Sequence, residues 1–589
     1  MSQAKVRIAL GFLILAACLL AASTWLVYSN TWDEPEHLAA GIELLDKGRY
    51  EYDTEHPPIV RIFMALGPYL AGARSFGTPP PDGVLEGVDI LYSGGHYKLY
   101  LTLARLGTLP FLALLLYSTW LWARRSSVSP GEALLAVLLT ASVPPILGHA
   151  ALATLDVAAA ATVLFALYAG QCWLSSGRWT DAVFCGLATG LAVGSKFSAV
   201  PFLVLGFGGL AVVNFFTHRT PEPTPVKRRL RDLAIILVTT LLPLALVYGI
   251  RSSSAVNVAH KFDWAVAFLL REHGLSHQAG VVLQHLWLPQ WVAGLLEGII
   301  AIKAHNDAGH MSFLLGQLRT TGWWYFYLVA LAVKTPLPLL ILGPVGMVLL
   351  AREGWRRSDD RAASEGDRAR ARKSRDSREI PSGSGDPWRL APLLMFLIVL
   401  VFASAFSHIN IGIRHVLVLY PFMALGAAHL VVRAWRALRA VPVRPLAIAG
   451  SGLLVVLVSW QVLTLWTANP DYLPYFNEAV AHPERVLVDS DLDWGQDLQR
   501  LEERAAAIKI PKLNLAYLGT PDLTRERLPP YVMMAPGKPV TGWIAISALA
   551  KAHYPKGYAW LNAYRPLETI GKTIELYYIP NRVSRDPEP

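Results

Sequence analysis

Long, nearly uninterrupted apolar blocks are the feature that most constrains how this 589-residue chain can fold. Residues 8–28, 390–406 and 446–466 are examples, and each is close to the ~20 residues that a helix needs to cross a bilayer. A cleaved signal peptide would account for the first block but for none of the later ones. Only 16% of the residues are charged, whereas soluble domains carry about 25%. These features predict a helical membrane protein with many spans.

The basic residues predict how the spans are oriented. Residues 181–216 are too long for one helix, so we divide them at Gly194-Ser195-Lys196 into two spans joined by a tight outer turn. The Lys and Arg clusters at 124–125, 227–231, 352–378 and 433–444 then share one side with the N-terminus, and such clusters mark the cytoplasmic side. The roughly 11 predicted spans are 8–28, 101–123, 131–147, 155–174, 181–195, 197–216, 232–250, 323–351, 390–406, 411–433 and 444–467.

The predicted fold class is mainly α. Residues 1–467 form a polytopic helical membrane domain, and residues 468–589 form a small α/β soluble domain on the outer side. In this tail, 485–489 and 513–518 are predicted strands and 497–508 a predicted helix. Outer loops are expected at 29–100 and 251–320, the second with helices lying at the membrane interface, and 352–389 is expected to be a disordered cytoplasmic loop.

A cluster of acids follows the first span, where the chain leaves the membrane. It comprises Asp33, Glu34, Glu36 and the neighbouring His37. A carboxylate in this place can act as the general base that takes a proton from an acceptor hydroxyl, or it can bind a metal ion. The structural alternative is a solvated helix start in which Asp33 or Glu34 is the cap.

A second motif, Glu55-His56-Pro57-Pro58, comes shortly downstream. The two prolines can begin a helix, which would place His56 and Arg61 near its positively polarised N-terminus. This arrangement suits an anion. It equally suits a structural turn whose Arg61 extends to lipid head groups.

Further polar groups recur at the outer ends of the predicted spans. A single Lys or Arg there is more often an interface anchor than a ligand, yet ionisable groups at membrane depth are rare and become functional candidates. The convergence of acids and cations on one side suits transfer from an anionic lipid donor. The groups are His149, Asp156, Lys196, Lys334, His408, Asn410, Arg414 and His415.

Other motifs are absent or less informative. The chain has no P-loop, no HExxH helix and no GxSxG elbow, and its three cysteines show no disulfide or CxxC pattern. The acidic tail segment 489–497 does not fit an EF-hand, and we interpret it as a turn with helix caps. A glycan contact by Trp494 is the alternative. The distribution of the +10 net charge does not indicate nucleic-acid binding.

The first span ending in Asp-Glu, the His-Pro-Pro motif and the Asp at the start of span four resemble the GT-C superfamily of glycosyltransferases. Residues 186–203 and 413–425 are similar to the branch of protein O-mannosyltransferases and aminoarabinose transferases, glycosyltransferase family 39. The tail stretch 489–501 resembles a bacterial subgroup. His56 stands where the aminoarabinose branch has Lys, which leans towards the mannosyltransferases.

The resemblance implies a role for most of these residues. Asp33 would be the catalytic base with Glu34 supporting it, Asp156 would shape the acceptor or base environment, and Glu36 could share the base role. Donor-phosphate contacts are implied for His56, Arg61, Lys196, Arg414 and His415. His37, His149, Lys334 and Asn410 remain candidates for substrate contacts. Members of the superfamily differ in metal dependence, so a divalent ion such as Mg or Mn stays open.

The main hypothesis is therefore an inverting membrane glycosyltransferase that uses a polyprenyl-phosphate sugar. Its acceptor hydroxyl would belong to a protein, lipid or glycan at the periplasmic face of a bacterial inner membrane. The N-terminus would be cytoplasmic and the C-terminal domain periplasmic. The alternatives are a transporter or flippase for lipid-linked or anionic solutes, and a non-catalytic scaffold.

Overall fold

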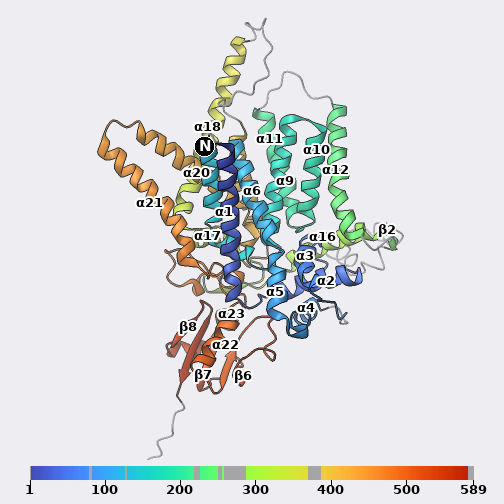
Figure 1. Cartoon of the computed structure of the whole chain (residues 1–589), viewed down its shortest axis with the longest axis vertical. Helices are drawn as coiled ribbons and strands as arrows, with labels where there is room; N and C mark the ends of the chain where they lie inside the picture. The colour runs from blue at the N-terminus through green and yellow to red at the C-terminus, as the bar shows by residue number, and fades with distance from the viewer. Residues whose placement is uncertain are drawn as a thin grey trace, which may run out of the picture.

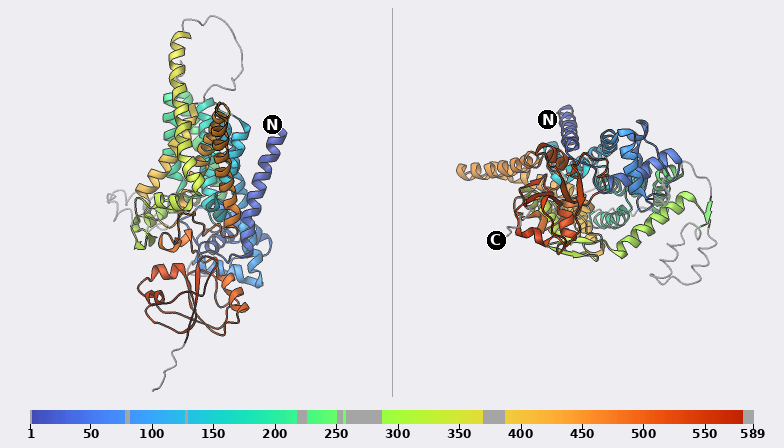
Figure 2. Two further views of the ribbon diagram at one scale, coloured as in Figure 1. Left: turned by 90° about the vertical axis from the view of Figure 1, so that its left-hand side faces the viewer. Right: turned by 90° about the horizontal axis from the view of Figure 1, so that it is seen from below.

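The protein consists of a bundle of membrane helices with a small α/β unit at one end (Figure 1). The computed structural model describes residues 2–77, 82–126, 129–217, 226–249, 255–257, 287–368 and 387–580. The N-terminus and the long extension of α18 lie at the end of the bundle away from the α/β unit (Figures 1 and 2). The predicted fold class, a mainly helical membrane protein with a C-terminal α/β part, is confirmed.

Seven helices within the described ranges are long and apolar enough to cross a membrane. They are Gln3–Leu26 (α1 with a short 3₁₀ turn), Tyr97–Ser126 (α5 and α6), Asp156–Ser176 (α9), Val226–Gly249 (α12), Leu337–Trp355 (in α18), Trp388–Phe406 (ending in α19) and Arg444–Ala468 (α21). An eighth candidate is the pair α7 (Pro130–Ala141) and α8 (Pro144–Ala150), bent by 65°.

Three further helices complete the bundle, namely α10 (Trp179–Val193), α11 (Ala199–Thr217) and α20 (Leu419–Arg439). A helix therefore lies in each of the predicted spans. The predicted break inside 181–216 is present between α10 and α11. A side chain at Gly194 would meet Ile59 at 2.3 Å, so this glycine lets α3 approach the break closely.

The first outer segment is helical, with α2 (Glu34–Lys47), α3 (Ile59–Leu70) and α4 (Gly83–Tyr92). α3 begins directly after Pro58, as its Pro-Pro sequence predicts. In the second outer segment α16 (Gln290–Ala308) lies across the ends of the long helices, and it is followed by the hairpin of β3 (Ser312–Leu314) and β4 (Gln317–Arg319) (Figures 1 and 2). A helix is thus present where interfacial helices were predicted, and its position at a membrane interface stays a prediction. The short β1 (Ala255–Asn257) pairs with β2 (Trp287–Pro289), and the rest of 250–286 lies outside the described residues.

Three local predictions are corrected by the structure. The predicted span 323–351 is two helices, α17 (Phe326–Lys334) and α18 (Leu337–Arg368), because Pro336 has no backbone N–H for a continuous helix. α18 continues through 352–368, where a disordered loop was expected. The remainder of that segment, 369–386, lies outside the described residues. The predicted strand 485–489 is not formed: both ends of this stretch lie in 3₁₀ turns, and the carbonyl of Val486 accepts from the N–H of Leu315 in the β3–β4 hairpin at 3.0 Å.

The C-terminal unit is a five-stranded sheet with helices on both faces. Its strand order is β6-β5-β7-β9-β8, in which β5 is parallel to β6 and β7, and β9 is antiparallel to β7 and β8. α22 (Leu498–Ala507) packs on one face and α23 (Ala548–His553) on the other, which confirms the predicted helix and the predicted strand at 513–518. The strands are Leu513–Ala516, Tyr531–Met533, Gly542–Ser547, Glu568–Ile570 and Ile574–Ile579, numbered β5 to β9.

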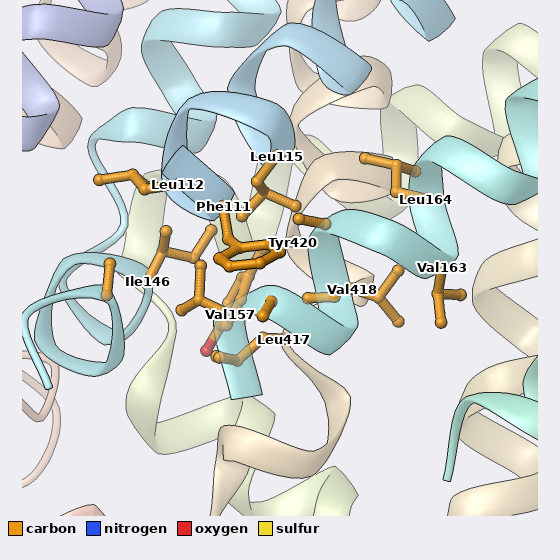
Figure 3. Close-up of a cluster of buried hydrophobic side chains, with 14 of the residues drawn as sticks. Phe111, Leu112, Leu115, Ile146, Val157, Val163, Leu164, Leu417, Val418 and Tyr420 are labelled. Atoms are coloured by element: carbon orange, nitrogen blue, oxygen red, sulfur yellow. The ribbon is translucent and has the colours of Figure 1, made fainter. Parts of the chain in front are cut away.

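A buried apolar core explains why distant polar residues meet near the outer end of the bundle. Val157 at the start of α9 packs with Leu417 and Tyr420, which surround the start of α20, while α6 and α8 contribute neighbours such as Leu112 and Ile146 (Figure 3). All of these side chains are at most 1% exposed. Because Asp156 precedes Val157 and the 3₁₀ turn Ile413–Val416 precedes Leu417, this core brings Asp156 and Arg414 together.

Candidate active site

A cavity of about 1210 Å³ lies between the C-terminal unit and the ends of the membrane helices nearest to it. Its walls come from the start of α2, the loop 51–56, residues 196–202, α16, the end of α19 and the turn that holds Arg414. The C-terminal unit contributes four more side chains, Asp489, Trp494, Leu549 and His553. The cavity therefore collects segments from nearly the whole chain.

Asp33 lies in this cavity directly before α2. Its Oδ2 accepts a hydrogen bond from Nη1 of Arg414 at 2.6 Å, and its side chain is 24% exposed. Among the described residues, nothing donates a hydrogen bond to the other carboxylate oxygen, Oδ1. Arg414 thus holds the carboxylate in one orientation while one oxygen stays accessible. This is the geometry that a general base requires.

Two cations and a second carboxylate extend this pair into the bundle. Asp156 starts α9, and its Oδ1 lies 2.6 Å from Nζ of Lys196, while its Oδ2 lies 3.6 Å from Nη1 of Arg414. Lys196 and Arg414 line the cavity, whereas Asp156 lies behind them at 3% exposure. Asp156 therefore positions the two cations. We call Asp33, Arg414, Asp156 and Lys196 the outer network.

Glu34 has a different environment from its neighbour Asp33. Its carboxylate is buried and pairs with Arg105 through two hydrogen bonds of 2.7 and 2.8 Å. It also accepts from the backbone N–H groups of Thr31 and Ala153, both at 2.8 Å. Glu34 thereby ties the start of α2 to α5 and to the loop before Asp156, which agrees with a supporting role. Arg105 was not singled out from the sequence, although it is a lone charge at the end of an apolar span.

Arg61 is completely buried and does not line the cavity. Its guanidinium pairs with the carboxylate of Asp53 and donates to the Tyr50 hydroxyl at 2.6 Å and to Nδ1 of His37 at 3.0 Å. Burial raises the pKa of Asp53, but the charge of Arg61 outweighs it and holds that pKa below its usual range. The predicted phosphate contact of Arg61 is not what this geometry favours, because Nη1 and Nη2 already donate inside the protein and Nε is buried away from the cavity.

His37 and His56 both line the cavity, with ring centroids 5.8 Å apart. Burial lowers the pKa of His37 well below its usual value, and the charge of Arg61 adds to this effect. Burial also lowers the pKa of His56. Both imidazoles are therefore uncharged at neutral pH and offer hydrogen bonds to a substrate rather than a positive charge.

Of the remaining candidates, Glu36, His408 and His415 line the cavity, and three others do not. Nδ1 of His415 lies 3.3 Å from the hydroxyl of Tyr327. Lys334 donates to the backbone carbonyls of Leu473 and Asp491 at 2.9 and 2.6 Å. Buried carbonyls need such donors, so Lys334 joins the tail to the membrane domain.

Asn410 and His149 also lie behind the cavity wall. Asn410 accepts from the backbone N–H of Trp323 at 2.7 Å, and His149 packs edge-on against Trp494 at 6.0 Å between ring centroids. Neither side chain lines the cavity, so the geometry places Asn410, His149 and Lys334 in packing roles.

The four cavity residues from the tail were not among the predicted site residues, although a glycan contact by Trp494 was the alternative interpretation. The ring of Trp494 lies under the guanidinium of Arg414, 4.3 Å from centroid to carbon. Asp489 has a left-handed backbone conformation with φ 51°, and burial raises its pKa to about 7, partly offset by Arg414. A non-glycine residue in this conformation is uncommon and often marks a functional position. The dense acids of 489–497 were the available signal, and they were interpreted as turn caps.

Aromatic side chains form an apolar wall at the other side of the cavity. Phe202 on α11 meets Phe402 on α19 edge to face at 5.9 Å, and Phe402 stacks on Phe406 at 5.1 Å. Phe406 is 61% exposed on the outer surface of the bundle. The cavity therefore leads from a charged floor to an apolar surface, which suits an amphiphile with an anionic head.

No three His, Cys, Asp or Glu side chains converge as metal ligands in the part of the chain that the structure describes. Among the acids at or next to the cavity, Asp33 pairs with Arg414, Asp156 with Lys196 and Asp53 with Arg61.

Fold and cavity together define a polytopic membrane protein with a charged site at the end that carries the C-terminal unit. Residues 102–246 match the family model described as dolichyl-phosphate-mannose-protein mannosyltransferase. The match covers about a quarter of the chain, from α5 to α12, and includes Asp156 and Lys196. It confirms the resemblance found in the sequence, and the matched family is one of glycosyltransferases, the predicted enzyme class.

The chain is also similar to solved structures at low identity. For ArnT from Cupriavidus metallidurans bound to undecaprenyl phosphate, the identity is 13% and the TM-score 0.46 over 98% of both chains. For the S. cerevisiae protein O-mannosyltransferase complex bound to the sugar donor, the values are 17% and 0.34 over 42% of this chain and 34% of that chain.

A third similar structure is the Archaeoglobus fulgidus oligosaccharyltransferase tethered with an acceptor peptide. It has 11% identity and a TM-score of 0.42 over 85% of this chain and 57% of that chain. No curated protein matches the chain.

Proposed function

We propose that this protein is a membrane glycosyltransferase that moves a sugar from a polyprenyl-phosphate donor to an acceptor hydroxyl. The observation that carries the proposal is the Asp33 carboxylate, which Arg414 holds at 2.6 Å with one oxygen facing a large cavity. The match of residues 102–246 to the mannosyltransferase family supports the same reaction class.

The hydrocarbon chain and the phosphate of the donor are expected to bind different parts of the cavity. Its hydrocarbon chain lies against Phe202, Phe402 and Phe406, and its phosphate binds Lys196 and Arg414. The ammonium of Lys196 has three N–H donors, and Asp156 uses one of them. Cations fixed in a partly buried site stabilise a phosphate strongly, because they need not reorganise as charge develops on it.

The transfer is a single displacement. Asp33 takes the proton from the acceptor hydroxyl, whose oxygen forms a bond to the anomeric carbon of the sugar. The bond from that carbon to the phosphate oxygen breaks, and its electron pair stays on the phosphate beside Lys196. In the proposed reaction the acceptor oxygen attacks on the side of the anomeric carbon opposite the departing phosphate, so the transfer inverts the anomeric configuration.

The distribution of charge supports a site on the periplasmic face of a bacterial inner membrane. Arg124 and Arg125 end α6, and Arg436 and Arg439 end α20, both at the end of the bundle that is remote from the cavity. Basic clusters of this kind mark the cytoplasmic side. The C-terminal unit, at the opposite end, then lies in the periplasm (Figure 1).

The test uses purified protein in lipid nanodiscs with radiolabelled polyprenyl-phosphate mannose and membrane extract as the source of acceptor. Asp33→Asn keeps the shape of the side chain but cannot take the proton, so we expect transfer to fall by about 10²–10⁴-fold. Asp46→Asn is the matched control, because Asp46 lies on the same helix α2 and does not line the cavity. Unchanged transfer in Asp33→Asn would remove Asp33 as the base. Movement of the lipid-linked sugar across vesicles without any product would favour a transporter.

A further inference from the structure

One segment of the tail, residues 489–497, contacts the backbone next to Asp33 and also the backbone next to Arg414. The N–H of Trp32 donates to the carbonyl of Trp494 at 3.1 Å, immediately before Asp33. The N–H of Ile413 donates to Oδ1 of Asp491 at 3.1 Å, immediately before Arg414. The residues that form the base and its partner are therefore each held, one position away, by the same short segment.

Further contacts join this segment to the same two stretches of chain, the one before Asp33 and the one before Arg414. The N–H of Ser29 donates to the carbonyl of Gln496 at 2.9 Å, and the hydroxyl of Ser490 donates to the carbonyl of Ile411. The ring of Trp494 stacks on the guanidinium of Arg414 itself. The segment thus contacts the backbone shortly before Arg414, at Ile411 and Ile413, and the side chain of Arg414 itself.

The segment is held in a fixed position, because several of its polar side chains are buried and hydrogen-bonded. Asp491 and Asp493 are at most 1% exposed, and Trp494 is 2% exposed. Lys334, which belongs to the membrane domain, donates a hydrogen bond to the backbone carbonyl of Asp491 at 2.6 Å. From the C-terminal unit, the N–H of Leu549 donates to Asp493 at 2.7 Å, and the hydroxyl of Thr573 donates to Asp497 at 2.9 Å.

We propose that residues 489–497 are a positioning segment that sets the Asp33–Arg414 geometry, with Trp494 and Asp491 as its positioning residues. The inference rests on the proposed function and gives the C-terminal unit a part in the reaction. Asp33 and Arg414 lie 381 residues apart in the sequence, so their relative position depends on what connects them in space. Misplacing a reacting group by about 1 Å can cost about 10²-fold in rate.

The first test compares variants of Trp494 in the transfer assay. Trp494→Ala removes the surface under Arg414, and we expect kcat to fall by about 10²-fold with the donor KM changed less than about threefold. Trp494→Phe keeps a ring there, so we expect it to restore kcat to within about fivefold of wild type. Trp543→Ala is the matched control, because Trp543 packs on Tyr578 in the sheet and does not line the cavity. A raised donor KM at unchanged kcat, or normal kinetics in Trp494→Ala, would overturn the inference.

The second test does not depend on activity. Hydrogen–deuterium exchange of the full-length protein in nanodiscs reports the N–H of Ile413, whose acceptor is Oδ1 of Asp491. We expect faster exchange at this amide in Asp491→Ala and near wild-type exchange in Asp491→Asn, which keeps an acceptor oxygen. Unchanged exchange in Asp491→Ala would overturn the inference, whether or not the protein transfers sugar. If both Asp491 variants exchange as expected but the wild-type protein forms no product, the positioning segment is upheld and the proposed function is rejected.

Discussion

Two networks of charged side chains lie at opposite ends of the helix bundle, and they differ in the space beside them. The outer network borders a cavity of about 1210 Å³. In the other, which we call the inner network, His429 on α20 contacts Glu132 on α7 at 3.0 Å and Glu353 on α18 at 3.4 Å. Arg389 and Arg433 each approach Glu353 at 3.1 Å.

The void beside Glu132 measures only about 10 Å³, about the minimum for a single water molecule. The inner network joins α7, α18 and α20, and the void found beside it among the described residues is too small for a ligand. Buried charges in a membrane protein therefore do not by themselves indicate a catalytic or binding site. The free volume beside them separates a structural network from a functional one.

Among variants of the two networks, the largest loss of transfer activity is expected at Arg414. Arg414→Ala removes a cation next to the phosphate and the partner that orients Asp33, so kcat/KM should fall by about 10²–10³-fold. Arg433→Ala, which removes an arginine of the inner network, should leave transfer within about twofold of wild type. Steady-state kinetics on both purified variants check the pair. Equal losses would show that free volume is not what distinguishes the two networks.

A smaller effect is expected at Lys196, the other end of the outer network. Lys196→Met keeps the length of the side chain but removes the charge, so the donor KM should rise roughly 10–100-fold, the worth of a charged hydrogen bond. Lys551→Met is the control, because Lys551 pairs with Glu575 in the C-terminal unit and does not line the cavity. Titration with the donor measures both values. An unchanged KM in Lys196→Met would place the phosphate elsewhere in the cavity.

A pH effect is expected from Glu36, which lines the cavity beside Asp33. Burial raises its pKa to about 8, and the negative charge of Asp53 adds to the rise. Glu36 is therefore protonated and neutral at pH 7 and becomes negative as the pH increases through 8. The added charge repels the donor phosphate, so kcat/KM should fall about tenfold between pH 7 and pH 9, where about one molecule in ten keeps the proton.

Glu36→Gln cannot ionise, so its kcat/KM should stay level over the same pH range. A pH series of initial rates at low donor concentration compares it with wild type. An identical alkaline decline in both proteins would assign the decline to another group.

The smallest effect on transfer is expected in the inner network. His429→Ala leaves the carboxylate of Glu132 without its imidazole partner, so the protein should lose about 1–3 kcal/mol of stability. The transfer rate of the folded fraction should stay within about twofold of wild type. Thermal unfolding in detergent and the transfer assay measure the two quantities. Loss of transfer at normal stability would show that the inner network takes part in function.

Asp33 and Glu34 show how far the site could be predicted. The sequence identifies both as acids at the point where the chain leaves the membrane, and it places Asp156, Lys196 and Arg414 on the same side. It does not show that Glu34 is closed off by Arg105 and Ala153, whereas Asp33 faces the cavity. Those partners are 71 and 119 residues away from Glu34.

The tail shows the same limit for whole segments. Its helix at 498–507 and its strand at 513–516 follow from local patterns, and both are predicted correctly. The segment 489–497 was interpreted as a turn. Its contacts with Trp32, Ile413 and Arg414 arise only when the C-terminal unit docks on the bundle.

The sequence by itself determined the membrane-spanning architecture, the side on which the polar residues gather and the α/β character of the tail. These are properties of continuous stretches of chain, since span length, charge bias and periodicity are all read within about 20 residues. Only the tertiary structure decided which of the buried charges face free volume. It committed Arg61 and Lys334 to partners inside the protein and left Lys196 and Arg414 at the cavity. A buried charge must be paired by whatever group folding brings beside it, and that group comes from a distant part of the chain.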